Sequence, residues 1–145
     1  MTNSNAPNPP DYAYDLDELL RAYRGYLGLS QRAMADRLGI REDSYRRMEL
    51  GTAACFPGLI DRLNAVVEEF LADVDKVVKM AELAADKPIE LDVSEDVKDQ
   101  WQRAVIGRAA VECGLIIPIL VGDVAQQRQD QSERREARFA GKSKA

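Results

Sequence analysis

Two short helical patterns separated by a single glycine constrain residues 28–51 more tightly than any other part of the chain. The first pattern follows Ser30, whose hydroxyl suits an N-cap. It stops at Gly39, because glycine readily adopts the left-handed conformation in which helices end. The second pattern runs from about Glu42 to Leu50 and stops at Gly51. The spacing predicts two consecutive helices joined by a tight turn.

A further helix is predicted upstream of this pair. Asp15 stands where an N-cap would, Glu18 lies at the spacing of a capping-box partner, and the apolar period ends near Gly28. Two short helices around a glycine-containing turn make a helix-turn-helix. We therefore expect a helix-turn-helix DNA-binding domain over residues 15–65.

A long helical pattern follows from about residue 58 to residue 85, with apolar residues alternately three and four positions apart. This spacing is typical of a heptad seam. Two interpretations stay open. The seam is either the interface of a dimer or the face of a long helix that packs on the 97–109 helix of its own subunit.

Two short strands are predicted beyond that helix. Residues 89–93 alternate apolar and acidic side chains, and residues 115–121 are apolar around Pro118, which favours a sheet edge because proline cannot donate a ladder hydrogen bond. A helix containing Trp101 lies between them and ends at Gly114. A two-stranded sheet is marginal alone and is often completed by a symmetry mate.

The predicted fold is mainly α, with an N-terminal helix-turn-helix bundle and a C-terminal α+β dimerisation region over residues 66–125. That region contains a long helix, a short strand, a helix and a short strand. Residues 1–14 are rich in Asn and Pro and are expected to be a disordered leader, and residues 126–145 a charged flexible tail, disordered or a frayed helix. The dimerisation contacts are predicted at Val67, Phe70, Val74, Val77, Trp101 and Ile117.

Composition argues against catalysis. The chain has no histidine, and Cys55 and Cys113 stand far apart without a CxxC pair, so we expect reduced thiols, no metal site, no cofactor and no enzyme. The longest apolar run is interrupted by Pro118 and is too short to cross a bilayer. We expect a cytoplasmic protein without a membrane partner.

The net charge of −5 is unevenly distributed along the chain. Residues 15–64 carry eight basic and eight acidic groups, and residues 65–125 carry six basic and thirteen acidic groups. The tail from Gln126 carries six basic and three acidic groups. An acidic middle region repels phosphate, so DNA affinity must come from individually placed arginines.

The segment from Gly28 to Gly51 resembles the phage-repressor class of helix-turn-helix, of the Cro and Xre-like type. The resemblance is carried, without gaps, by Gly28-Leu29-Ser30-Gln31, Ala35, Leu38-Gly39-Ile40, Met48, Glu49 and Gly51. More narrowly, residues 43–70 with the following strand, Trp-containing helix and strand are similar to YdiL-type regulators and anti-CRISPR-associated autoregulators. That similarity implies a C-terminal dimerisation domain and repression.

The resemblance also implies which side chains meet DNA, because recognition helices insert their N-terminal part into the major groove. Carried over position by position, the base contacts fall on Arg46, Arg47, Ser44, Asp43 and Glu42. The phosphate contacts fall on Gln31, Arg32 and Arg41. Acidic residues at 42 and 43 depart from the family pattern, and they also suit the first turn of a helix for electrostatic reasons alone. Glu49 is expected to be structural.

Two hypotheses follow from these features. The first is a homodimeric repressor that binds double-stranded DNA at an inverted repeat through residues 42–50. The alternative is an antitoxin-like or adaptor protein whose acidic C-terminal region, with its charge of −7, binds a protein partner.

Overall fold

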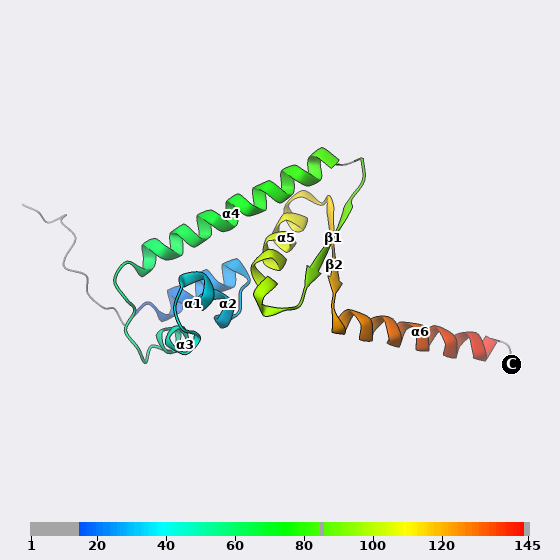
Figure 1. The fold of residues 1–145 in the computed structure, drawn as a ribbon, viewed down its shortest axis with the longest axis horizontal. Helices are drawn as coiled ribbons and strands as arrows, with labels where there is room; N and C mark the ends of the chain where they lie inside the picture. The colour runs from blue at the N-terminus through cyan, green and yellow to red at the C-terminus, as the bar shows by residue number, and fades with distance from the viewer. Residues whose placement is uncertain (1–14, 85, 144–145) are drawn as a thin grey trace, which may run out of the picture. The chain divides into compact units, whose positions relative to one another are not determined.

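The computed structural model describes residues 15–84 and 86–143, which are mainly helical and divide into two compact units. The first unit extends to Val77 and the second begins at Val78 (Figure 1). The expected leader, residues 1–14, lies outside the described residues. The predicted fold class is confirmed: N-terminal helices with a helix-turn-helix arrangement are followed by a long helix and two short strands.

The first unit is built from helices α1 to α4. Their bounds are Asp17–Leu27 for α1, Gln31–Leu38 for α2, Glu42–Leu50 for α3 and Leu59–Ala84 for α4, whose last turns belong to the second unit. The expected N-cap of α2 is confirmed, because the Ser30 hydroxyl accepts a hydrogen bond from the Ala33 amide at 3.2 Å. Gly39 and Gly51 end α2 and α3 with φ of 72° and 78°.

The expected cap of the first helix is wrong. Helix α1 begins at Asp17 after Leu16, and no side chain caps it. Glu18 accepts a hydrogen bond from Arg21 at 2.6 Å instead of reaching back to the backbone. The two carboxylates of the first turn, Asp17 and Glu18, complement the positive end of the helix without a capping box.

The core of the first unit lies between these helices. Leu20, Met34, Leu38 and Tyr45 have no exposed surface, and Leu63 of α4 is 1% exposed. Two polar contacts attach α4 to the rest of the unit. Tyr23 of α1 donates to Asn64 at 2.6 Å, and Arg37 of α2 donates to Glu69 at 3.3 Å. The position of α3 is therefore fixed by a packed core.

The second unit contains a parallel pair of strands with a helix between them. Strand β1 is Ile89–Ser94 and β2 is Ile116–Val121, with Ile89 opposite Ile116 and Ser94 opposite Val121. The connection contains a 3₁₀ turn, Val97–Asp99, and helix α5, Gln100–Cys113. Helix α5 packs on both strands, and Val93, Val105, Ile106 and Ile116 are buried.

The chain after β2 forms helix α6, Asp123–Ser143. The sequence predicts a flexible tail from residue 126, disordered or a frayed helix, whereas the structure has one continuous helix that begins three residues earlier. Nearly all α6 side chains as far as Gly141 are exposed. Because little of the helix is buried, its side chains support it mainly through local pairs, such as Gln126 with Asp130 at 3.0 Å.

We predict opposite effects for alanine at two glycines of the first unit. Gly39→Ala should lower the free energy of unfolding by about 1–2 kcal/mol, because φ is +72° and a Cβ would lie 3.3 Å from Nη2 of Arg62. Gly25→Ala in α1, where a Cβ meets nothing within 4 Å, should raise it by about 0.5 kcal/mol. Urea unfolding followed by circular dichroism measures both. Equal effects at the two sites would contradict this assignment of the turn.

Candidate nucleic-acid interface

Helix α3 has one buried face and one exposed face. Tyr45, Met48 and Glu49 point into the unit, whereas Arg46 and Arg47 have side chains that are 51% and 60% exposed. The helix therefore presents its arginines to solvent, as a recognition helix must. The predicted base-contacting residues share this exposed side of the domain, except that Ser44 and Glu42 are half-buried.

Each arginine of the exposed face is paired with a carboxylate one turn earlier. Arg46 lies 2.9 Å from Glu42, and Arg47 lies 3.3 Å from Asp43. Such solvent-exposed pairs contribute little to stability, so each arginine can exchange its carboxylate for another partner. Glu42 and Asp43 therefore neutralise the charges of the two arginines but do not prevent them from binding another partner.

Asp43 is shared between two cations. Arg41 lies 3.5 Å from its carboxylate, in addition to Arg47. Its own backbone N–H, Arg41 and Arg47 all favour the ionised form and lower the pKa of Asp43 below its ordinary value. Asp43 thus stays charged at neutral pH and holds both arginines near the N-terminus of α3.

Gln31, a predicted phosphate contact, already has a partner at each end of its side chain. Its carbonyl oxygen accepts from Nε of Arg46 at 3.4 Å, and its amide donates to Glu49 at 3.4 Å. Gln31 stands at the first position of α2, where the exposed backbone amides and the helix dipole favour an anion. It links that helix N-terminus to the arginines of α3.

Glu49 is the one charged side chain that is buried among the described residues, at 2% exposure. Arg24 of α1 donates to both of its oxygens, from Nη2 at 2.6 Å and from Nε at 3.0 Å. Burial is the largest single influence and favours the neutral acid, but the hydrogen bonds from Arg24, its positive charge and the hydrogen bond from Gln31 act together with Tyr45 to lower the pKa of this carboxylate. The expectation that Glu49 is structural is confirmed.

A groove lies beside α3, and a further arginine, Arg62, lies against one of the residues that line it. Its volume is about 480 Å³, and Arg41, Ser44 and Arg47 line it together with the loop that follows α3. Arg62 of α4 stacks on Phe56 of that loop, with its guanidinium carbon 5.7 Å from the ring centre. Arg62 could not be predicted as part of this surface because it lies outside the two-helix pattern, and only the path of the loop places its guanidinium near Gly39 in the turn.

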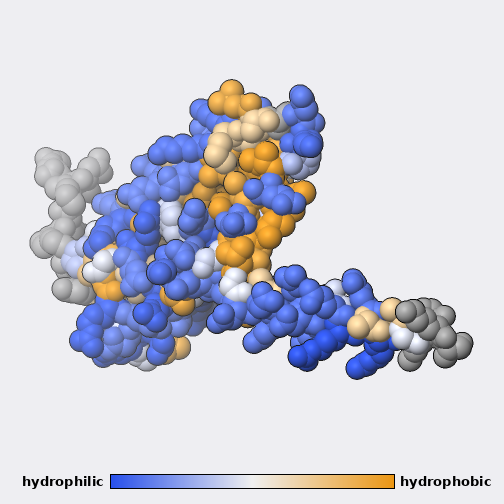
Figure 2. Space-filling view, turned by 45° about the vertical axis from the view of Figure 1, so that its right-hand side comes forward, coloured by the Kyte–Doolittle hydropathy of each residue, from blue (hydrophilic) through white to orange (hydrophobic). Residues whose placement is uncertain are grey.

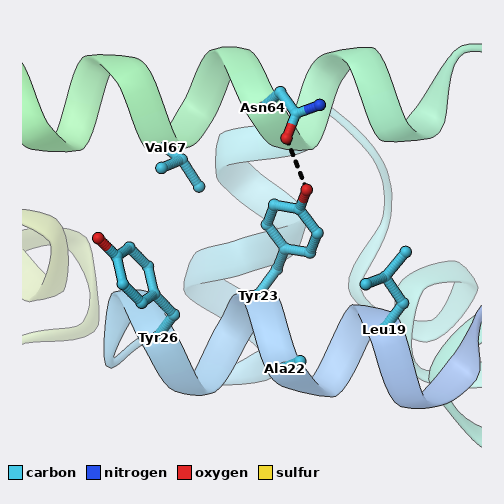
Figure 3. A pocket seen from close by; sticks show the side chains of 6 residues that line it. All are labelled: Leu19, Ala22, Tyr23, Tyr26, Asn64 and Val67. Atoms are coloured by element: carbon cyan, nitrogen blue, oxygen red, sulfur yellow. Dashed lines mark hydrogen bonds between the residues drawn. The ribbon is translucent and has the colours of Figure 1, made fainter.

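A second groove runs between α1 and α4, away from these arginines in sequence. It has a volume of about 300 Å³ and is mostly apolar (Figure 3). Tyr23 and Tyr26 rise from α1 toward α4, where Asn64 and Val67 face them. Val67, a predicted dimerisation residue, is therefore half-buried along this groove.

The other predicted dimerisation residues divide by exposure. Phe70 and Val74 are 1% and 2% exposed within a single chain, and Val77 and Trp101 are half-buried. Ile117 is 47% exposed. Only Ile117 therefore offers a partner a large apolar surface without a rearrangement of the chain.

Comparison with known protein families agrees with this geometry. Residues 15–68 match the model of a helix-turn-helix domain family that is found in Xre- and Cro-like regulators. This part of the chain has the arrangement and the sequence pattern of a helix-turn-helix domain, which supports a role in DNA binding. Comparisons with curated proteins and with solved structures find no match. In the ranges that the structure describes, no helix has the length and hydrophobicity of a membrane span.

We predict that Glu49→Gln lowers the free energy of unfolding of the full chain by about 2 kcal/mol at pH 7, because Arg24 loses a charged partner in a buried site. The folded-state pKa of Glu49 is lowered, so its contribution is present above the unfolded value of about 4.3 and is lost as the pH falls further. The difference between wild type and variant should therefore shrink below about pH 4.

Glu18→Gln is the matched control for this prediction. Glu18 pairs with Arg21 at 2.6 Å, but its side chain is 79% exposed, so the loss should stay below about 0.5 kcal/mol. Urea unfolding between about pH 3 and pH 8 gives the free energy of unfolding of each variant relative to wild type. These limits lie on either side of the ordinary carboxylate pKa of about 4. A Glu49→Gln effect as small as that of the control would contradict the assigned role of the buried pair.

Proposed function

We propose that this protein is a sequence-specific transcriptional regulator, a homodimeric phage-type repressor that binds an inverted-repeat operator through α3. The single observation that supports this best is the pair of exposed arginines on α3, within a domain that matches a helix-turn-helix family. The narrower similarity to YdiL-type and anti-CRISPR-associated autoregulators belongs to the same proposal. In it, the first unit reads DNA and the second unit dimerises.

The energetics favour transfer of the arginines from their carboxylates to DNA. Breaking either exposed pair, Arg46 with Glu42 or Arg47 with Asp43, costs little because water screens both partners. A bidentate contact of arginine with O6 and N7 of guanine contributes about 1–3 kcal/mol of discrimination. Correct bases therefore displace the carboxylates, whereas bulk phosphate has less to gain.

We predict that Arg47→Ala, and separately Arg46→Ala, weakens binding to a selected operator by about 10- to 100-fold without unfolding the protein. Both side chains are exposed, so their loss leaves the core intact. Fluorescence anisotropy with duplexes recovered from a random pool measures the affinities. Lys76→Ala, at a cation that is 80% exposed on α4, is the control and should bind as wild type does.

The opposite change tests the role of the acidic residues. Glu42→Gln combined with Asp43→Asn should raise affinity for non-specific DNA by about tenfold and steepen its salt dependence, because two arginines lose their intramolecular partners. If a carboxylate also accepts from cytosine N4, specific affinity falls in the same variant. Unchanged affinity for both kinds of DNA would show that these pairs do not control the interface.

A further inference from the structure

The two strands of the second unit have one covered face and one open face. Val93 and Ile116 are buried on the side against which α5 packs. On the opposite side, β2 exposes an apolar row, with Ile117, Ile119 and Val121 at 47%, 37% and 40% exposure. The strand register places the acidic row of β1 beside it, so the outer sheet face consists of Glu90, Asp92, Ser94, Ile117, Ile119 and Val121.

This arrangement is unusual for parallel strands, which normally have both faces covered. Figure 2 shows hydrophobic side chains gathered over the strands of the second unit. A row of three β-branched residues at partial exposure fits a surface that another protein covers. We therefore expect the exposed face of the two strands to pack against an apolar surface of another protein.

The free edge of β2 is a poor place for that partner to add a strand. The Ile89 amide donates to the Leu115 carbonyl at 2.9 Å, so the backbone of Leu115 faces β1. Backbone groups alternate in direction along a strand, so those of residue 118 point away from β1, toward the free edge. Pro118 occupies that outward position and has no N–H to donate. Pairing through the face, rather than extension of the sheet at this edge, is favoured.

Helix α6 supplies the complement that the acidic row needs. Its start is fixed beside the sheet, because the Glu95 carboxylate accepts from the Val124 amide at 3.1 Å. Beyond that point nearly all of its side chains are exposed, and after Glu133 the helix carries Arg134, Arg135 and Arg138 against a single acid, Glu136. One chain thus presents an acidic strand and a helix with a basic C-terminal half in the same unit.

A two-fold interface must be self-complementary, because the same surface patch meets itself. An apolar row satisfies this requirement, and so do an acidic row and a basic helix segment that belong to the same unit. We propose that the outer sheet face is the homodimer interface, with the apolar rows of two copies in contact and α6 of each copy along the acidic row of the other. This inference rests on the proposed function, because a protein that reads an inverted repeat needs two copies.

The size of the face also requires α6. Two strands of six residues cover roughly 20 Å by 10 Å, well below the about 800 Å² per partner of a standard interface. A helix of 21 residues adds a length of about 30 Å. The sheet face and the helix together approach the necessary area, whereas neither does so alone.

The first test measures the mass of the full chain by light scattering and sedimentation equilibrium at micromolar concentration. The wild type should have twice the chain mass of 16.2 kDa. Ile117→Glu combined with Ile119→Glu should weaken dimerisation by at least about 100-fold, because two carboxylates would be buried. Val111→Glu is the matched control. Val111 is 85% exposed on α5, outside the outer sheet face, so this variant should remain dimeric.

The second test exchanges charges, which avoids any effect on the apolar contact. Glu90→Arg with Asp92→Arg should weaken the homodimer by at least about tenfold, and so should Arg134→Glu with Arg135→Glu and Arg138→Glu. A mixture of the two variants should form a heterodimer of near wild-type affinity, because each acidic surface then meets a basic one. Circular dichroism of every variant establishes that the fold is retained.

The outcomes separate this inference from the proposed function. A monomeric wild type, a double glutamate variant as dimeric as the control, or a charge-exchanged mixture that stays monomeric would overturn the interface. A chain that selects an inverted repeat and is dimeric, but whose dimer does not depend on Ile117 and Ile119, would overturn the interface alone. A dimer that depends on Ile117 and Ile119 but selects no DNA sequence would overturn the proposed function alone.

Discussion

The packed core of the first unit contains a buried charge, the carboxylate of Glu49 of α3, and the orientation of α3 depends on the ion pair of that carboxylate with Arg24 of α1. A carboxylate that is 2% exposed costs free energy unless it is fully paired, and the two hydrogen bonds from Arg24 provide that pairing. Because Gln31 of α2 also donates to Glu49, a single carboxylate contacts all three helices. The angle at which α3 presents its outer face is thereby tied to α1 and α2.

The exposed side of α3 follows the opposite principle. There the ion pairs are weak and local, and the carboxylates of Glu42 and Asp43 can leave their arginines at little cost. The domain thus combines a rigid inner face with an exchangeable outer face. In the proposed function, such a surface is nearly neutral toward bulk phosphate and gains affinity only where bases offer arginine better partners. Dimerisation through the second unit would then raise the affinity well above that of one domain, because the second domain binds as part of the same molecule.

Local features of the fold could be predicted from sequence, whereas long-range contacts could not. Ser30, Gly39 and Gly51 mark helix ends through their own conformational preferences, and each lies where the spacing predicted. The predicted N-cap at Asp15 was wrong. An acidic residue just before a helix fits the sequence pattern of a cap whether or not its carboxylate accepts a hydrogen bond from the first turn. The partner of Glu49 lies 25 residues away, which no spacing rule reveals.

The candidate site shows the same division. The position of Arg46 and Arg47 on the outer face of α3 was predictable from helical periodicity, and their pairing with carboxylates four residues earlier was available from the same periodicity. The approach of Arg62 to the turn was not, because it depends on the path of the loop around Phe56. The open face of β2 emerges only when the strand register is known, since apolar residues occur on both sides of that strand.

Selection of bound duplexes from a random pool with the full-length protein tests the central claim most directly. The account predicts enrichment of an inverted repeat whose half-site centres lie about 34 Å apart, or a multiple of that distance, with guanines at the positions that α3 faces. A pool that remains random after repeated rounds would contradict the claim that the exposed arginines of α3 read DNA sequence.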